Sequence, residues 1–401
     1  MKRYIYSSIV VALVVICIGT YYVYSNVSAD SLPTINIQKI SGDEKEIKSM
    51  IITGDYVGNT DSNQFKLTVN GADFKKNNPF LEDNFQQSHK INQLRKKYRN
   101  FMRGKLNEAS FYEDKNFLIY SNIFNENYSN IEDDIKIKTS VLKKKDNKKT
   151  SFTISIPNEK QYGSFYVQDV QLVKNNQLKL IANNTQNLYS NTPNNEIHVY
   201  TIDLEKQKLL SDDVLTSDPV GDTYNQYNSY SYSDRTIPNK YFLFKNDQFT
   251  MVEQSDGSTD EQLLQSQLIA YNLEKNKKEV IELPEKLKNA NIEAYIDQVI
   301  YLTIRDKKGV KLYTYNLENK KIENECTLQL PSNGQDWNEG MTLSFDQNKV
   351  FLLGSYINTN NESHLFVNEI STGKSLYEGK INKKGNDKKD FIHFNEIQVN
   401  R

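Results

Sequence analysis

The sequence predicts an all-β fold made of repeated four-stranded units, and three observations lead to this prediction. Short runs rich in Tyr, Phe, Val, Ile and Thr alternate with a period near two, and clusters of Asn, Asp, Lys and Gly separate them. A strand–turn–strand pattern recurs along the chain. The chain has only two cysteines, Cys17 and Cys326, so packing and strand pairing rather than disulfides must hold the body together.

Four copies of the repeat share an alternating strand, an Asp/Asn–Leu–Glu-like step and a polar turn that leads into another apolar pair. The copies are Val199–Lys208, Ile269–Lys277, Tyr313–Lys321 and Phe366–Lys374. Asp or Asn suits the bend because its side chain can bond its own backbone. The anchoring residues Leu204, Leu273, Leu317 and Ile370 are 69, 44 and 53 residues apart. These intervals fit the blades of a β-propeller with loops of variable length.

A second hairpin upstream of each copy would complete four strands per unit. These hairpins are Val170–Leu172 with Leu178–Ile181, Tyr241–Leu243 with Phe249–Val252, Ala294–Ile296 with Val299–Leu302, and Leu343–Phe345 with Val350–Leu353. A fifth unit is predicted over Phe117–Ile156, with strands near Phe117–Tyr120, Ile135–Val141 and Phe152–Ile156.

The strands Met50–Ile52 and Phe65–Val69 near the start and Phe391–Phe394 near the end would close a last blade from both ends of the chain. Closure of this kind removes exposed sheet edges. We therefore predict a β-propeller of six four-stranded blades, with five or seven blades as alternatives. A two-sheet sandwich or an irregular β-solenoid is the competing interpretation.

One repeat resembles a known family. Ser371–Tyr377 is similar to the Thr-Gly-Lys turn of the quinoprotein-type propeller repeat, with Tyr377 where that repeat usually has Trp. The other three copies lack the Gly, so the resemblance implies the fold and not quinone chemistry. The layout of the chain is also similar to membrane-anchored propeller proteins of uncharacterised role in Gram-positive bacteria.

The N-terminal segment from Tyr4 to Tyr24 contains no charged residue. Twenty-one helical residues span about 31 Å, the thickness of the hydrocarbon core of a bilayer. Positive charge precedes the segment at Arg3 and next occurs at Lys39, so the N-terminus is expected in the cytoplasm and the body outside the cell. The expected domains are 1–25 as a transmembrane anchor, 26–35 as a linker and 36–401 as the propeller, with a helical insertion at 86–109.

Two alternatives to a permanent anchor remain open. Val27-Ser28-Ala29 before Asp30 has the small-residue form of a signal-peptidase site, so cleavage after Ala29 would release the body. A lipoprotein signal is the third reading, but the bulky Ile16 before Cys17 fits it poorly.

A basic amphipathic helix is predicted within His89–Ala109. Apolar residues recur there at intervals of three and four, namely Ile91, Leu94, Tyr98, Phe101, Met102 and Leu106. The remaining faces are cationic, and Arg95, Lys96, Lys97, Arg99 and Arg103 are the candidate contacts with an anionic lipid or wall polymer. The alternative is a helix packed on the propeller with a solvated cationic face.

A tyrosine-rich segment, Ser217–Pro238, is predicted to form a large loop between blades. It carries Tyr224, Tyr227, Tyr230 and Tyr232 among Asn, Ser, Asp and Gly. Tyr with Asn and Ser is typical of recognition surfaces, so these tyrosines are the candidate partner-binding residues. An ordinary surface loop is the alternative.

Catalytic signals are weak. The four histidines, His89, His198, His364 and His393, lack metal-ligand spacing, and no metal or cofactor site is expected. The 50 Lys and Arg balance 51 Asp and Glu, so no global field favours nucleic acid. We therefore expect a membrane-tethered extracellular module that recognises a protein or glycan and regulates a membrane partner. The alternative is an extracellular carbohydrate-active hydrolase or lyase that uses carboxylates in the propeller channel.

Overall fold

The structure is a computed structural model that describes residues 10–16, 19–20, 32–58, 62–75, 88–125, 135–186, 194–216, 223–230, 236–254, 257–296, 298–306, 309–330, 340–354, 356–357, 362–385 and 390–399. The chain divides into two compact units. Unit 1 comprises Met1–Gln86, Arg305–Lys311 and Cys326–Arg401, and unit 2 comprises Gln87–Ile304 and Leu312–Glu325. Each unit is treated separately below.

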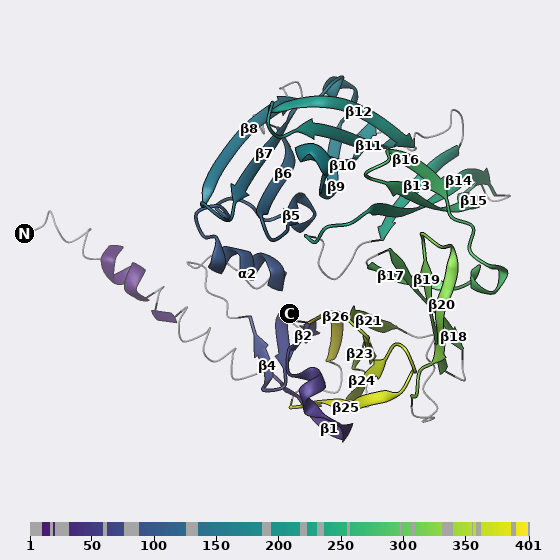
Figure 1. Cartoon of the computed structure of the whole chain (residues 1–401). Helices are drawn as coiled ribbons and strands as arrows, with labels where there is room; N and C mark the ends of the chain where they lie inside the picture. Colours follow the sequence, from purple (N-terminus) through teal and green to yellow (C-terminus); the bar gives the residue numbers. More distant parts are fainter. Residues whose placement is uncertain are drawn as a thin grey trace, which may run out of the picture. The chain divides into compact units, whose positions relative to one another are not determined.

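The described strands form six antiparallel sheets, as many as the predicted number of blades. Four of these sheets have four strands that follow one another in chain order, and the other two have five (Figure 1). The prediction of an all-β fold with six sheets is therefore confirmed. In two of the six sheets a fifth strand, which the sequence did not predict, joins the four-stranded unit: β1 pairs with β25, and the two-residue β23 pairs with β26.

Three of the four-stranded sheets lie wholly in unit 2. The β5–β8 sheet has β5 (Phe111–Glu113), β6 (Phe117–Asn125), β7 (Ile135–Lys143) and β8 (Lys148–Ser155). The β9–β12 sheet has β9 (Ser164–Val173), β10 (Gln177–Gln186), β11 (Asn194–Asp203) and β12 (Lys208–Thr216). The β13–β16 sheet has β13 (Thr223–Tyr230), β14 (Tyr241–Glu253), β15 (Thr259–Asn272) and β16 (Lys277–Val280).

The β17–β20 sheet is the fourth meander. Its strands are β17 (Asn291–Ile296), β18 (Val299–Asp306), β19 (Gly309–Asn316) and β20 (Lys321–Thr327).

Unit 1 holds the two five-stranded sheets. One is ordered β1 (Thr34–Gly42), β25 (Ser375–Lys384), β24 (Glu362–Glu369), β22 (Lys349–Gly354) and β21 (Met341–Asp346). The other is ordered β23 (Tyr356–Ile357), β26 (Phe391–Val399), β2 (Met50–Val57), β3 (Ser62–Thr68) and β4 (Gly71–Phe74). β26 pairs with β2 from Met50↔Val399 to Val57↔Phe391, so the two ends of the chain share a sheet as predicted.

Residues 10–16 and 19–20 are helical, and further short helices follow along the chain. They are α2 (His89–Lys97) and the 3-10 turns η2 (Glu44–Ile47), η4 (Glu108–Ser110), η5 (Glu159–Gln161), η6 (Lys174–Asn176) and η7 (Glu285–Leu287). β1 begins at Thr34, inside the predicted 26–35 linker.

The repeat motif folds as its sequence predicts. In the first three copies the Asp or Asn carboxyl or amide oxygen accepts two backbone N–H bonds: Asp203 from Glu205 and Lys206, Asn272 from Glu274 and Lys275, and Asn316 from Glu318 and Asn319. In all four copies the anchoring residue donates its own N–H to the preceding hairpin turn. The pairs are Leu204 to Asn176, Leu273 to Lys240, Leu317 to Gln298 and Ile370 to Asn348, at 2.8–3.1 Å. The motif thus ties each hairpin to the turn before it.

The predicted hairpin Tyr241–Leu243 with Phe249–Val252 is wrong. β14 runs straight through it for 13 residues, and β13 supplies the missing strand from the segment predicted to be a loop. The polar residues Lys245, Asn246 and Asp247 suggested a turn, yet Asp247 is buried and its carboxylate lies 2.9 Å from the Lys245 ammonium. An ion pair within one strand therefore satisfies Lys245 and one oxygen of Asp247, while Asn246 Oδ1 and Asp247 Oδ1 are buried with no hydrogen-bond partner in the described part of the chain.

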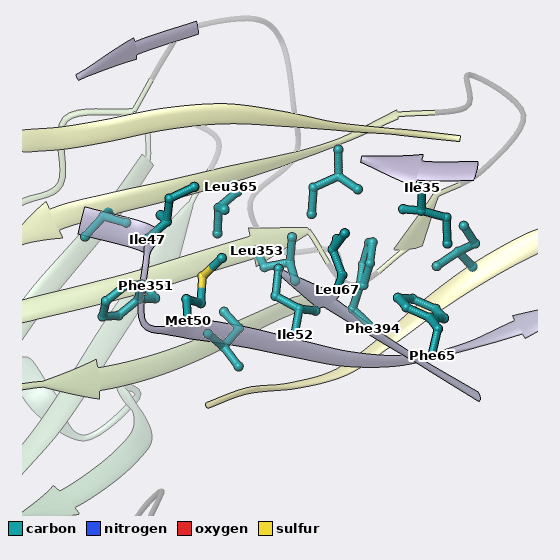
Figure 2. Packing of buried hydrophobic residues seen from close by; sticks show 14 of the residues in the cluster. Ile35, Ile47, Met50, Ile52, Phe65, Leu67, Phe351, Leu353, Leu365 and Phe394 are labelled. Atoms are coloured by element: carbon teal, nitrogen blue, oxygen red, sulfur yellow. The ribbon is translucent and has the colours of Figure 1, made fainter. Parts of the chain in front are cut away.

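Each unit has its own apolar core. In unit 1, Phe65 and Leu67 of β3 and Phe394 of β26 pack with Ile52 of β2 and Leu353 of β22 (Figure 2). In unit 2, one cluster joins the β5–β8 and β9–β12 sheets through residues such as Ile119, Ile137, Leu180 and Tyr200. Alternating inward side chains from facing sheets produce this packing.

No helix among the described residues is long and apolar enough to cross a membrane. Most of Tyr4–Tyr24 lies outside the described residues, as does the Ala29–Asp30 bond.

Candidate functional site

The basic helix is shorter than its sequence pattern suggests. α2 begins after Ser88, whose hydroxyl accepts the N–H of Ile91 at 3.2 Å, and it ends at Lys97. The chain then turns, and Gly104 adopts a positive φ of 72°. The predicted helix over 86–109 is therefore wrong beyond Lys97.

The apolar face of this segment packs on the β5–β8 sheet of unit 2. Ile91, Leu94, Phe101 and Met102 are buried against Phe111, Leu118, Tyr120 and Leu142, and Tyr98 lies at the margin. Leu106 was expected on this face but is 51% exposed, because the turns after Lys97 carry it away from the sheet. α2 lies beside β5 in Figure 1. α2 therefore packs on a sheet through its apolar face, as the alternative of a packed helix with a solvated cationic face required. This packing determines which side of α2 faces solvent.

An ion-pair cluster holds α2 in place. The Glu113 carboxylate on β5 contacts the Lys144 ammonium at 2.7 Å and the Lys90 ammonium at 2.9 Å. Burial alone would raise the pKa of the Glu113 carboxyl, but the hydrogen bonds from Lys144 and Lys90, together with their charges, lower it. Glu113 therefore stays ionised, and both of its oxygens are occupied.

The predicted anionic-surface contacts are mainly exposed. Lys96, Lys97, Arg99 and Arg103 are exposed, and Arg95 is half-buried. The Lys97 ammonium lies 5.2 Å from the Tyr98 ring. Lys96, Arg99 and Arg103 form no ion pair with any carboxylate in the described ranges. We name Arg95, Lys96, Lys97, Arg99 and Arg103 the α2 basic surface.

Three of the predicted partner-binding tyrosines lie on a strand, and the fourth, Tyr232, is outside the described residues. Tyr224 stacks on Phe249 with ring centroids 5.7 Å apart, and Tyr227 meets Phe244 edge-on at 6.3 Å. Tyr230 packs against the apolar cluster around Leu243 and Tyr295. The loop prediction is wrong for β13, because these tyrosines belong to a strand. Successive tyrosines lie on opposite faces of this strand, and their rings pack on residues of neighbouring strands. A binding role for them stays a prediction.

A histidine network that sequence reasoning missed lies on the β9–β12 sheet. The His198 ring is buried, with Nδ1 at 2.7 Å from Asp212 Oδ1 and Nε2 at 3.1 Å from Glu196 Oε2. The Tyr162 hydroxyl donates to Glu196 at 2.6 Å and lies 3.1 Å from His198 Nε2. Tyr200 stacks on the imidazole, with ring centroids 5.6 Å apart.

The charges of this network stabilise the imidazolium. Burial would lower the pKa of His198, but hydrogen bonds and charges from Asp212 and Glu196 raise it. Burial, and then the hydrogen bond to Glu196, raise the pKa of the Tyr162 hydroxyl. A nucleophilic triad needs a hydroxyl or thiol that the imidazole can deprotonate, but here Nε2 faces a carboxylate and a weakly acidic phenol. The network is thus suited to holding charge rather than to activating a nucleophile.

The same geometry bears on metal binding. Asp212 and Glu196 bind opposite nitrogens of the His198 ring, so they do not converge on one point. Within the part of the chain that the structure describes, no group of three or more His, Cys, Asp or Glu side chains could hold a metal ion.

Comparisons with known proteins give distant similarities only. No family model matches the chain, and no curated protein matches it. Among solved structures, TolB from Acinetobacter baumannii shares 11% identity over 87% of this chain and 82% of its own, with a TM-score of 0.23. A prolyl endopeptidase shares 9% over 83% of this chain, with a TM-score of 0.31, and this chain spans 49% of its length. A variant of B. megaterium levansucrase shares 10% over 73% of this chain and 85% of its own, with a TM-score of 0.31. Scores this low carry no weight for fold or function.

Proposed function

We propose that this chain is an extracellular binding module whose six sheets close as a six-bladed propeller and whose α2 basic surface contacts an anionic polymer or lipid surface. The segment Tyr4–Tyr24 would tether it to the membrane, with the N-terminus in the cytoplasm. The single observation that supports the contact is the α2 basic surface itself, since four of its five cations are exposed while α2 is fixed on its sheet.

The electrostatics favour a surface over a small ligand. Each Lys or Arg close to an anionic membrane contributes about 1 kcal/mol, so the five cations together would contribute a few kcal/mol. This attraction acts over about one Debye length, near 8 Å at physiological salt. Binding should therefore be strong at low salt and weaken steeply as salt is added.

The experiment measures co-sedimentation of residues 32–401, which include all six sheets, with vesicles of neutral or anionic phospholipid. We expect binding to anionic vesicles only. Changing Arg95, Lys96, Lys97 and Arg99 to Gln should reduce it at least about tenfold, corresponding to 1.4 kcal/mol or more.

The matched control removes the same number of positive charges from hairpins elsewhere in unit 2. Its substitutions are Lys206→Gln, Lys208→Gln, Lys275→Gln and Lys277→Gln, all at exposed positions. Equal losses in the two variants, or no binding of the unmodified protein, would refute the proposal.

The carbohydrate-active alternative has no specific support among the described residues. Glu196 and Asp212 are two neighbouring acids, but both are bound to the His198 ring rather than free to attack or protonate a sugar. Recognition of a protein or glycan by other surfaces is compatible with the proposed module.

A further inference from the structure

A second group of lysines lies on the α2-facing side of the β5–β8 sheet, apart from the α2 basic surface. Lys105 follows Gly104 and is only 8% exposed. Its ammonium lies 4.9 Å from the centre of the Phe101 ring and 5.6 Å from that of Tyr120. A lysine this buried normally reaches a carboxylate or a carbonyl. No acceptor for the Lys105 ammonium is found in the ranges that the structure describes.

Two exposed lysines of β7 and β8 also lie over aromatic rings on this side of the sheet, and one of them shares a ring with Lys105. The Lys149 ammonium on β8 lies 6.0 Å from the Phe101 ring, which is the ring that Lys105 also contacts. The Lys138 ammonium on β7 lies 5.8 Å from the Phe124 ring of β6. Both strands present these lysines on one face, because Leu142 pairs with Lys149, and Lys138 and Leu142 lie four positions apart on β7.

Hydroxyl groups lie between these lysines on the sheet. Ser140 of β7 pairs with Tyr120 on one side and with Ser151 on the other. The Ser151 hydroxyl donates to the Ser140 hydroxyl at 2.9 Å, and the Asn122 amide donates to the Tyr120 hydroxyl at 3.2 Å. The surface therefore combines three cations, aromatic rings and neutral hydrogen-bonding groups.

Among the described residues, no carboxylate forms an ion pair with Lys105, Lys138 or Lys149. Glu113 on β5 is already shared by Lys90 and Lys144. Burial, followed by the charges of Lys149 and Lys138, lowers the pKa of Lys105 to about 8. Repulsion among the three ammonium groups and the burial of Lys105 destabilise the folded protein. An anionic ligand would offset this loss of stability.

We propose that Lys105, Lys138 and Lys149 form a binding site for a phosphoryl group. Three separate ammonium groups suit a ligand with three or more acceptor oxygens directed apart, whereas a carboxylate offers two oxygens in one plane. The aromatic rings exclude water on one side and strengthen the attraction. This inference rests on the proposed function, since it names the ligand chemistry of the same anionic partner, but it uses different residues.

A phosphoryl group could come from a phospholipid headgroup or from a soluble phosphate ester. The test therefore uses the full chain in nonionic detergent micelles and titrates it calorimetrically with glycerol 3-phosphate or, separately, with micelles that contain phosphatidylglycerol. We expect saturable binding of at least one of these probes near neutral pH, with glycerol 3-phosphate affinity in the millimolar range or tighter, about −4 kcal/mol. No saturable binding of either probe would overturn the proposal.

The variants separate this site from the α2 basic surface. Lys105→Met keeps the apolar part of the side chain and should weaken binding at least about tenfold. Lys149→Gln should also weaken binding. Lys277→Met, at an exposed position on β16, is the matched control and should bind as the unmodified protein does. Loss of binding in the Arg95, Lys96, Lys97 and Arg99 variant but not in Lys105→Met would support the α2 contact and refute this site.

A thermal melt distinguishes a ligand site from a structural lysine. Without ligand, Lys105→Met should melt at the same temperature as the unmodified protein or higher, because it removes a buried cation. With glycerol 3-phosphate, the unmodified protein and the Lys277→Met control should gain stability, and Lys105→Met should gain less. A lower melting temperature of Lys105→Met without ligand, with unchanged affinity, would mean that Lys105 serves packing alone.

Discussion

Replacing Asp212 with Asn should destabilise unit 2 more at pH 6 than at pH 9. The His198 ring is buried between Asp212 and Glu196, and its pKa is raised in the folded protein. A raised histidine pKa means that the folded state binds the proton more tightly than the unfolded chain, whose pKa is about 6.5. The stabilisation is therefore fully present below about pH 6.5 and is lost as pH rises through the folded-state pKa.

The magnitude follows from the contact that the substitution changes. The 2.7 Å hydrogen bond between His198 Nδ1 and Asp212 joins two charged groups at low pH, and such bonds contribute roughly 1.5–3 kcal/mol. Once the pH exceeds the raised folded-state pKa, the imidazole is neutral and Asn can still accept its N–H, so the loss should fall towards about 0.5 kcal/mol. We expect the two losses to differ by about 1 kcal/mol or more.

The assay is urea unfolding of the full chain in nonionic detergent at pH 6 and pH 9, followed by circular dichroism. NMR titration of the histidine ring protons should show a lower pKa for His198 in the variant. Asp213→Asn is the matched control, because Asp213 is the next residue on β12, is exposed, and loses the same charge. Equal losses at both pH values, or an equal pH dependence in the control, would refute the role assigned to the network.

Two further predictions concern the lysine site and the core of unit 1. Glycerol 3-phosphate affinity should fall as pH rises above about 8, because Lys105 loses its charge there, and a flat calorimetric profile from pH 7 to 9.5 would contradict this. Phe394→Ala should cost about 3–5 kcal/mol in urea unfolding, because the ring is 1% exposed within the cluster of Figure 2. Phe391→Ala on the same strand should cost under about 1 kcal/mol, since its ring is 43% exposed, and similar costs for the two would contradict the described packing.

Local chemistry made the repeats predictable. Asp203, Asn272 and Asn316 bond the backbone within the next three residues, so the turns depend on neighbours in the chain and show in the sequence. The alternation of apolar residues likewise located most strands of both units, including the sheet that joins β26 to β2.

Errors arose where long-range contacts override local pattern. The tyrosine-rich segment resembled a loop until β14 provided a partner strand for β13. The apolar spacing typical of a helix continues in the sequence beyond Lys97, but the chain forms turns over Tyr98–Lys105 instead. These turns bring two adjacent residues, Phe101 and Met102, onto the sheet. Propensity is a weak guide when burial of aromatic area decides the outcome.

The sequence by itself determined that the chain is built of repeated β-hairpins and has an apolar segment near its N-terminus. It also showed that basic residues cluster on the polar side of an amphipathic helix. Only the tertiary structure placed His198 between two acids and brought Lys105 to Lys138 and Lys149. Periodicity depends on neighbours within a few positions, whereas Asp212 reaches His198 from the adjacent strand β12, and Lys105 lies in the turns after α2, far in sequence from Lys138 and Lys149. The charges of these groups matter because folding removes water from around them.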